Sequence, residues 1–335
     1  HNESIELYIG KSALKINPDE QNIDLFDRVL NYDHLVLTTG SEPRELPHYT
    51  TSNIKNLFTM RDLTDANSIE PFMKIGMRLL IVGGGYIGLE AAATAQKFGV
   101  DVTLVELEDR ILKRVAAKET SDYIRSLHIS KGVKIKEATG LEKLKIKRDK
   151  VVSASFTDNS NINVDFVIVG IGIIPNTKLA EDTNITVNNG IFVNERCQTS
   201  ISNIYAAGDC ASFNYKNTLV RLESVGNAID QATIVAKNIS GQNATYNPKP
   251  WFWSDQYDLK LQIAGLNTGY DNVVVRGDKS KNVSHWYFKG SELLAIDALN
   301  DPRAYMIGKR LIEANKSPSK EQVKDQDFNL KALLK

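Results

Sequence analysis

The strongest pattern along the chain is a pair of apolar runs that enclose a cluster of glycines. MRLLIV (residues 77–82) is apolar at almost every position, which is typical of a parallel strand buried on both faces. GGGYIG (83–88) follows directly, and the apolar spacing after it predicts a helix from Tyr86 to Phe98. DVTLV (101–105) predicts a second buried strand, which ends at Glu106. This succession predicts a βαβ unit of the dinucleotide-binding type.

Weaker patterns predict further elements on both sides of this unit. Ile5, Leu7 and Ile9 alternate with polar or aromatic neighbours and predict an opening strand. A helix is predicted over 117–128. Short strands are predicted over 134–137, 141–146, 151–156, 165–169 and 204–207.

The three glycines that fit G-x-G-x-x-G each have a different task in nucleotide binding. Gly83 permits a tight turn, Gly85 lets a diphosphate approach the backbone, and Gly88 lets the helix pack against the strand. The free N–H groups at the helix start, near Tyr86 and Ile87, carry partial positive charge that attracts phosphate. We therefore predict that this turn binds a dinucleotide.

Two acidic residues near the turn are candidate contacts to the rest of the nucleotide. Glu106 lies about 20 positions after Gly83, the spacing of a carboxylate that binds the adenosine ribose and repels a 2′-phosphate. This favours NADH over NADPH, although the nearby Arg110 would weaken the exclusion. Glu90 is either a carboxylate that serves only the helix dipole or a contact to the nicotinamide end.

Length and composition narrow the class of protein. The chain has 335 residues, which suits two or three domains. Its net charge is zero, so nothing favours nucleic acid or an anionic membrane as a partner. No apolar run of about 18 residues predicts a membrane span. The two cysteines, Cys197 and Cys210, are far apart and suit a reducing compartment, so we expect a cytoplasmic protein with no metal site.

A second nucleotide signature lies more than a hundred residues later. SNIYAAGDCAS (202–212) combines a short apolar run with Gly208 and Asp209. An aspartate at a strand end beside a glycine is suited to hold the hydroxyls of a polyol chain. Taken alone, the same string is more often a turn with a capping aspartate.

The order of these motifs resembles that of flavoproteins with two dinucleotide folds. SNIYAAGDCAS is similar to their C-terminal flavin fingerprint, and LVLTTGSEPRELP (35–47) to their A-T-G-x-x-P-R crossover, with Thr38 in place of alanine. FTMRDLTDA (58–66) and VIVGIGIIPNTKLAE (167–181) resemble the segments that lead into and out of an inserted NAD domain.

The C-terminal third resembles one branch, the NADH-dependent ferredoxin reductases. The resemblance is carried by RLESVGNAIDQATIVAKNISG (221–241), PKPWFWSDQYDLKLQIAGL (248–266) and LLAIDALNDPRAYMIGKRLIE (293–313). It implies FAD-dependent electron transfer from NADH to a [2Fe–2S] ferredoxin or a rubredoxin that serves oxygenases or cytochromes P-450. The acceptor would bind to a monomer or a weak dimer.

The resemblance also implies a fold and domain bounds. The fold is α/β, with two Rossmann-like dinucleotide-binding domains, the FAD one incomplete, and a small α+β C-terminal domain. The FAD domain would comprise 1–60 and 175–246, the NAD domain 61–174, and the C-terminal reductase domain 247–335. Family members begin with a strand and G-x-G-x-x-G for the FAD diphosphate, and we expect about 70 such residues to precede His1.

Site residues follow from the same resemblance. No catalytic side chain is implied, because the flavin carries the chemistry. FAD would contact Ala13, Thr39, Gly40, Arg61, Asp209, Val225 and Trp253, and NADH would contact Glu90, Glu106 and Gly172. For Trp251 and Phe252 we favour a place in the core of the third domain, and for Trp253 a place beside the flavin. His128 and His285 are expected to be structural, and Cys210 a small core residue.

Two other functions remain open at this level. One is a different enzyme branch, an NADH oxidase, peroxidase or disulfide reductase, whose catalytic cysteine would lie before His1. The other is a non-catalytic nucleotide-binding or redox-sensing module, which a resemblance to apoptosis-inducing factor would allow.

Overall fold

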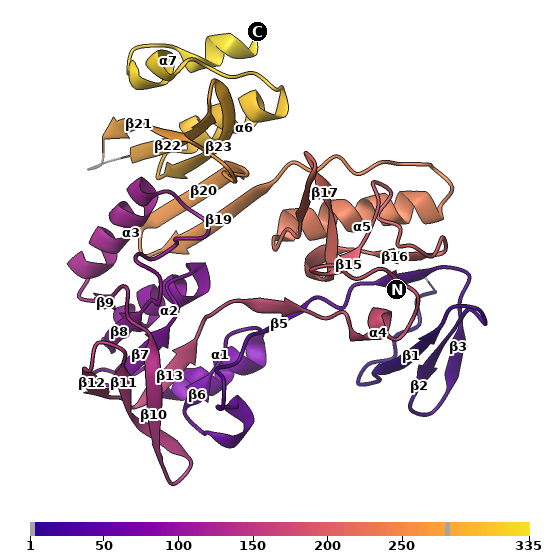
Figure 1. Ribbon diagram of the computed structural model, residues 1–335, viewed down its shortest axis with the longest axis horizontal. Coiled ribbons are helices and arrows are strands. Elements are labelled where there is room, and N and C mark those ends of the chain that lie inside the picture. Colours follow the sequence, from indigo (N-terminus) through magenta and orange to yellow (C-terminus); the bar gives the residue numbers. More distant parts are fainter. Residues whose placement is uncertain (1–3, 279–281) are drawn as a thin grey trace. The chain divides into compact units, whose positions relative to one another are not determined.

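The computed structural model describes residues 4–278 and 282–335, and the chain divides into two compact units (Figure 1). The first unit comprises residues 1–42 and 174–250. The second comprises residues 43–173 and 251–335. Each unit is therefore built from two separate stretches of chain, as expected when one domain is inserted into another.

The second unit contains a five-stranded parallel sheet in the order β6-β13-β7-β8-β9. Its strands are β6 (Leu57–Phe58), β7 (Arg78–Val82), β8 (Asp101–Val105), β9 (Lys134–Lys136) and β13 (Phe166–Val169). After Arg78 every residue of β7 is buried, and so is every residue of β13, because helices and a hairpin cover both faces of the sheet. The covering helices are α1 (Leu63–Ile69), α2 (Tyr86–Lys97) and α3 (Lys118–Ser130).

An antiparallel meander packs on the same sheet. It consists of β10 (Leu141–Lys147), β11 (Lys150–Phe156) and β12 (Asn161–Asn163). Leu144, Val151, Ala154 and Phe156 are buried against the parallel sheet. Lys143, Lys145 and Lys147 are exposed, so the opposite face of this hairpin is solvated.

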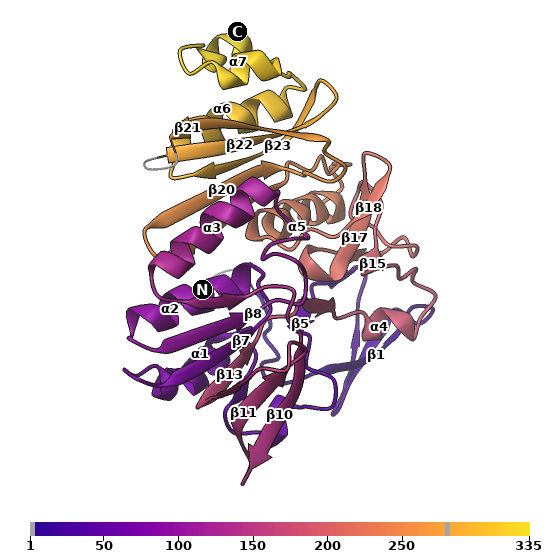
Figure 2. The same cartoon turned by 60° about the vertical axis from the view of Figure 1, so that its left-hand side comes forward.

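The C-terminal part of the second unit is a five-stranded antiparallel sheet in the order β19-β20-β23-β22-β21. The strands are β19 (Trp251–Gln256), β20 (Leu259–Gly265), β21 (Asn272–Asp278), β22 (Asn282–Lys289) and β23 (Glu292–Leu299). Helices α6 (Pro302–Glu313) and α7 (Lys320–Lys324) lie on one side of this sheet, and α3 lies on the other (Figure 2).

The two faces of this sheet are set by the period-two alternation of β22 and β23. Trp286, Phe288 and Ile296 pack with α6 and α7. His285, Tyr287 and Asp297 point the other way and contact α3 or the segment just before it. The face toward the nucleotide-binding sheet thus carries polar side chains that are buried, and each requires a hydrogen-bonding partner there.

The first unit is built from smaller sheets. β1 (Ala13–Asn17), β2 (Asn22–Leu25) and β3 (Val29–Asn31) form an antiparallel meander, and β4 (Leu35–Leu37) pairs in parallel with β16 (Ile204–Ala206). The remaining elements are β5 (Ser41–Pro43), β14 (Ile173–Pro175), β15 (Ile191–Phe192), β17 (Ala211–Tyr215), β18 (Thr218–Val220), α4 (Lys178–Glu181) and α5 (Val225–Ile239). Its core gathers β4, β16 and β17 around Leu37, Ile204 and Phe213.

Most predicted elements are confirmed with shifts of one to two residues at their ends. The opening strand over Ile5–Ile9 is wrong. Ser4 to Lys11 have no strand partner, and Ile5, Leu7 and Ile9 are exposed, since alternation alone does not supply the neighbour that a strand needs. Cys210 is confirmed as a buried residue. Among the described residues no helix is both long and apolar enough to cross a membrane.

Candidate dinucleotide sites

Two of the three fingerprint glycines are required by the packing of the chain itself. Gly83 has a φ of +108°, and a Cβ there would lie 2.4 Å from the carbonyl oxygen of Gly170. A Cβ on Gly88 would lie 2.1 Å from the carbonyl oxygen of Gly83. Both positions therefore exclude any side chain, and they bring α2 close to the ends of β7 and β13.

Gly85 is different, because the packing of the described residues leaves room for a side chain there. Its backbone is extended, and a Cβ there would meet no atom within 4 Å. It is the N-cap of α2, and no side chain caps the N–H groups of the first turn. An open backbone at an uncapped helix start fits a diphosphate, whose oxygens would accept from these N–H groups.

Glu106 lies at the end of β8, where its carboxylate holds the glycine turn. One oxygen accepts from the N–H of Gly84 at 2.6 Å, and the other accepts from the N–H of Glu108 at 2.9 Å. The side chain is only partly buried, so it has acceptor capacity left for a ribose on its exposed side. The same carboxylate thus shapes the turn and borders the place where a bound nucleotide would lie.

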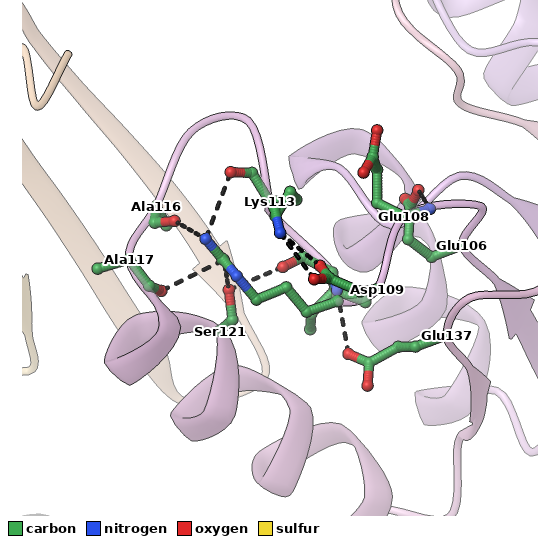
Figure 3. A network of polar contacts seen from close by, with 10 residues as sticks. Glu106, Glu108, Asp109, Lys113, Ala116, Ala117, Ser121 and Glu137 are labelled. Carbon is green, nitrogen blue, oxygen red and sulfur yellow. Dashed lines mark hydrogen bonds and ion pairs between the residues drawn. The ribbon is translucent and has the colours of Figure 1, made fainter. Parts of the chain in front are cut away.

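Arg110 was expected to weaken the exclusion of a 2′-phosphate, and in the structure its guanidinium is held by groups of the chain itself. Its guanidinium donates to the carbonyl oxygen of Ala116 at 2.8 Å, to those of Ala117 and Lys113 at 3.4 Å, and to the hydroxyl of Ser121. Ala116, Ala117 and Ser121 lie at the start of α3, and Lys113 lies in the loop before it (Figure 3). The donors of the guanidinium are therefore directed into the 110–121 segment.

Tyr86 contributes its backbone to the helix start, but its side chain belongs to the interior. The ring packs against Phe252 of β19 with centroids 4.9 Å apart, and the hydroxyl oxygen is buried. The next residue, Ile87, is 42% exposed. The first turn of α2 thus packs against the C-terminal sheet through Tyr86 and is exposed to solvent at Ile87.

Glu90 lies one turn further along α2 and faces β19. The hydroxyl of Ser254 donates to its carboxylate at 2.5 Å. Burial raises the pKa of Glu90 above its ordinary value, and the hydrogen bond from Ser254 lowers it. Glu90 is therefore held by a specific donor on β19 and is not simply a solvated group on the helix surface.

Gly172, Arg61 and Trp253 are the other predicted site residues in the second unit. The carbonyl of Gly172 accepts from the N–H of Arg44 at 2.9 Å, just past the end of β13. Arg61 is exposed and precedes α1, where its N–H donates to Asp65. Trp253 is 40% exposed and stacks on Trp251 with centroids 5.3 Å apart. Trp251 and Phe252 are only partly buried, so neither is a fully enclosed core residue.

Three of the predicted flavin residues of the first unit lie at the carboxyl ends of β4 and β16, namely Thr39, Gly40 and Asp209. Because these two strands are parallel neighbours, Thr39 and Gly40 lie beside Gly208 and Asp209. The hydroxyl of Ser41 donates to the Asp209 carboxylate at 3.1 Å, and the N–H of Gly208 donates to Gln231 of α5 at 2.8 Å. A carboxylate, two glycines and a helix start at one sheet edge fit a ligand with hydroxyl and phosphate groups.

The remaining two positions of this unit differ in accessibility. Val225 is the first residue of α5 and is 57% exposed, with Ser224 as the N-cap. Ala13 begins β1 and is partly buried. Thr39 is also tied to the chain, since its hydroxyl donates to the carbonyl of Asn176 at 2.6 Å.

Ser254, Gln256 and Tyr257 lie on β19 and in the turn after it, and no local sequence pattern marks them as site residues. They belong to the string WFWSDQYD, where serine, glutamine and tyrosine are spaced among aromatic residues. Ser254 and Gln256 are both buried, whereas polar residues in that string could equally have been solvated. His128, which was expected to be structural, is buried and contacts both Gln256 and Tyr257.

Comparison with known proteins agrees with this geometry. Residues 1–232 match the family described as pyridine nucleotide-disulphide oxidoreductase, and residues 251–334 match the family described as reductase C-terminal. Rhodocoxin reductase of Rhodococcus erythropolis is 39% identical over 98% of this chain and 78% of its own length. Putidaredoxin reductase of Pseudomonas putida is 38% identical over 99% of this chain and 81% of its own length.

Solved structures give the same result. The covalent putidaredoxin reductase–putidaredoxin complex matches with a TM-score of 0.93 and 38% identity, over 97% of this chain and 80% of that chain. A ferredoxin reductase from Rhodopseudomonas palustris matches with a TM-score of 0.93 and 33% identity. The match covers 98% of this chain and 82% of that chain. The chain therefore belongs to the pyridine nucleotide-disulphide oxidoreductases, and within them to the FAD-dependent ferredoxin reductases that take electrons from NAD(P)H.

Proposed function

We propose that this reductase uses NADH in preference to NADPH and passes single electrons to a [2Fe–2S] ferredoxin that serves an oxygenase. The observation that carries the NADH preference is the pairing of Glu106 with the glycine turn, with Arg110 directed elsewhere. A carboxylate at this position accepts from two ribose hydroxyls and repels a phosphate. Two cations of this segment are engaged elsewhere, since Arg110 donates to Ala116 and Ser121 and Lys113 pairs with Asp109.

The proposed NADH site lies along α2 and the ends of β7, β8 and β13. The diphosphate would bind at Gly85 and the N–H groups of Tyr86 and Ile87, with Gly83 and Gly88 shaping the turn. Glu106 would hold the adenosine ribose. Glu90 and Gly172 would contact the nicotinamide end, where an ionised Glu90 offers an acceptor to the carboxamide N–H.

The proposed FAD contacts are Ala13, Thr39, Gly40, Arg61, Asp209, Val225 and Trp253. These residues would hold FAD, which would supply the chemistry that links hydride transfer from a nicotinamide to single-electron transfer. Asp209 would accept hydrogen bonds from the ribityl hydroxyls, and the exposed start of α5 at Val225 would place a helix dipole near the ring. Trp253 has the exposed face that a stacking residue needs.

The nature of the acceptor is supported by the names of relatives. These include terpredoxin reductase of a Pseudomonas species and the ferredoxin–NAD(+) reductase component of the anthranilate 1,2-dioxygenase system of Burkholderia cepacia. A rubredoxin is the second candidate. We also propose a cytoplasmic protein, in keeping with its two unpaired thiols, that is a monomer or a weak dimer.

Steady-state kinetics on the purified holoenzyme test this proposal. We expect visible flavin bands, reduction of ferricyanide by NADH, and a KM for NADPH at least tenfold above that for NADH. Reduction of a purified [2Fe–2S] ferredoxin under anaerobic conditions should be faster than that of a rubredoxin at equal concentration. Equal use of the two nucleotides would refute the role of Glu106, and a preference for rubredoxin would refute the acceptor.

A further inference from the structure

Ser254 lies at the end of a directional chain of hydrogen bonds, and we infer that it is a positioning residue that fixes Glu90 as an acceptor for the nicotinamide carboxamide. The inference rests on the proposed function, in which Glu90 contacts the nicotinamide. It adds that this contact depends on a second strand, β19, whose side chains reach α2 from the C-terminal sheet. Ser254 itself would not contact NADH.

The first link is between Ser254 and Glu90. The serine is 1% exposed, and its hydroxyl oxygen lies 2.5 Å from one carboxylate oxygen of Glu90. Phe252, two residues earlier on the same strand, packs against the Tyr86 ring at the start of α2. Because α2 is held against β19 at two points one turn apart, the Glu90 side chain has little freedom to rotate away.

The second link determines where the serine proton points. The side-chain amide of Gln256 donates to the Ser254 oxygen at 3.0 Å. A serine hydroxyl has a single proton, and with Gln256 occupying its acceptor side that proton is directed at Glu90. Gln256 is fully buried, so it cannot exchange this contact for water.

The third link orients Gln256 and returns to the nucleotide-binding domain. The Gln256 carbonyl oxygen lies 2.8 Å from Nε2 of His128 on α3, and the Tyr257 hydroxyl lies 3.2 Å from Nδ1. Burial lowers the pKa of His128, so its ring is neutral and carries one proton. With that proton on Nε2, every group donates in one direction: Tyr257 to His128, His128 to Gln256, Gln256 to Ser254, and Ser254 to Glu90.

The charge of Glu90 depends on this last donation. Burial and the neighbouring Asp255 carboxylate both raise the pKa of Glu90, while Ser254 and the backbone N–H of Asp255 lower it. Asp255 on β19 and Tyr86 on α2 itself are the titratable groups that interact with it. Without the serine hydroxyl, Glu90 would take up a proton at a higher pH, and a protonated carboxyl would offer a donor where the carboxamide needs an acceptor.

The test compares Ser254→Ala with two other serine variants in the FAD-loaded enzyme. We expect Ser254→Ala to raise both the KM for NADH and the calorimetric Kd for NAD⁺ by about tenfold, the usual effect of losing a hydrogen bond to a charged group. The acidic limb of the pH profile of kcat/KM should move to higher pH. Ser254→Thr keeps a hydroxyl and should restore most of the affinity and the pH limb.

Ser284→Ala is the matched control. Ser284 is buried in the same sheet, but its hydroxyl contacts Trp286 and the carbonyl of Arg276 instead of α2. Its loss should leave the KM and the pH limb unchanged. Three outcomes would each overturn the inference. Ser254→Ala and Ser284→Ala could have equal effects, or the pH limb of Ser254→Ala could stay in place. The third is that Ser254→Thr restores neither the affinity nor the pH limb.

Glu90→Gln separates this inference from the proposed function. If Glu90→Gln leaves the KM for NADH and the Kd for NAD⁺ unchanged, the proposed contact between Glu90 and the nicotinamide is wrong. If Glu90→Gln raises the KM for NADH and the Kd for NAD⁺ but Ser254→Ala does not, the contact between Glu90 and the nicotinamide stands. The positioning role of Ser254 is then wrong.

Discussion

The hydroxyl of Thr120 on α3 donates to the carboxylate of Asp297 on β23 at 2.6 Å, and both side chains are fully buried. Tyr287 donates to the same carboxylate oxygen and accepts from the N–H of Ala117 at 3.0 Å. Nδ1 of His285 lies 2.7 Å from the Thr120 oxygen. The nucleotide-binding domain and the C-terminal sheet are therefore joined by a buried polar cluster as well as by apolar packing.

Asp297 should make the enzyme less stable as pH rises from about 4 to about 6. Burial raises its pKa to about 6, against 3.8 for an ordinary aspartate. In this window the folded state holds a proton that the unfolded state has lost, so the free energy of unfolding falls with rising pH, by on the order of 3 kcal/mol. Denaturant unfolding of wild type and Asp297→Asn across pH 4–8 measures this difference.

Asp297→Asn is suitable because its amide oxygen still accepts from Thr120 and Tyr287 while the titratable group is gone. The stability difference between the two proteins should change between pH 4 and 6 and stay constant above it. A difference that is independent of pH would show that Asp297 titrates at its ordinary pKa.

His128 should make the free energy of unfolding depend on pH in the opposite direction, so that stability rises with pH. Burial lowers its pKa below the ordinary 6.5, so the folded state keeps the ring neutral where the unfolded state is protonated. The contribution of the neutral His128 ring to the free energy of unfolding is constant above about pH 6.5. It is lost as the pH falls below that value. The free energy of unfolding of wild type relative to His128→Gln should therefore decrease as the pH falls from 7 to 5. An unchanged difference over this range would contradict a depressed pKa.

The parts of the fold that could be predicted from the sequence are those specified by local patterns. The apolar run of β7, the glycine turn and Glu106 place a βαβ unit because each signal concerns neighbouring residues. The bond between Ser254 and Glu90 joins positions 164 residues apart, and no local spacing indicates it. The orientation of the Arg110 side chain could not be predicted either, because its acceptors are mostly backbone carbonyls, which every residue carries. The residue roles at both nucleotide sites remain predictions.

Alanine substitutions at Gly85 and Gly88 should separate binding from folding. Gly88→Ala places a Cβ 2.1 Å from the Gly83 oxygen and should destabilise the fold by about 1–3 kcal/mol or more. Gly85→Ala meets open space in an extended backbone, so the stability should change by less than about 0.5 kcal/mol. Its methyl group would nevertheless lie where the diphosphate binds, and the KM for NADH should rise about tenfold or more. A Gly85→Ala enzyme with normal KM would place the diphosphate elsewhere.

Glu106 and Arg110 lie close in sequence but should have different effects when replaced. Glu106→Ala removes the ribose acceptor and the bond to the N–H of Gly84, so the KM for NADH should rise about tenfold or more. The KM for NADPH should rise less, because the repulsion of its 2′-phosphate disappears at the same time. The ratio of the KM for NADPH to the KM for NADH therefore measures how strongly the Glu106 carboxylate repels the 2′-phosphate, which neither KM value does alone.

Arg110→Ala is the counterpart, since the guanidinium supports the 110–121 segment through Ala116, Ala117 and Ser121. It should lower the free energy of unfolding by about 1–3 kcal/mol, because buried acceptors lose their donor. The ratio of KM for NADPH to KM for NADH should stay at the wild-type value. If Arg110→Ala instead raises the KM for NADPH alone, the guanidinium turns toward the nucleotide in the working enzyme, and the exclusion of NADPH depends on more than Glu106.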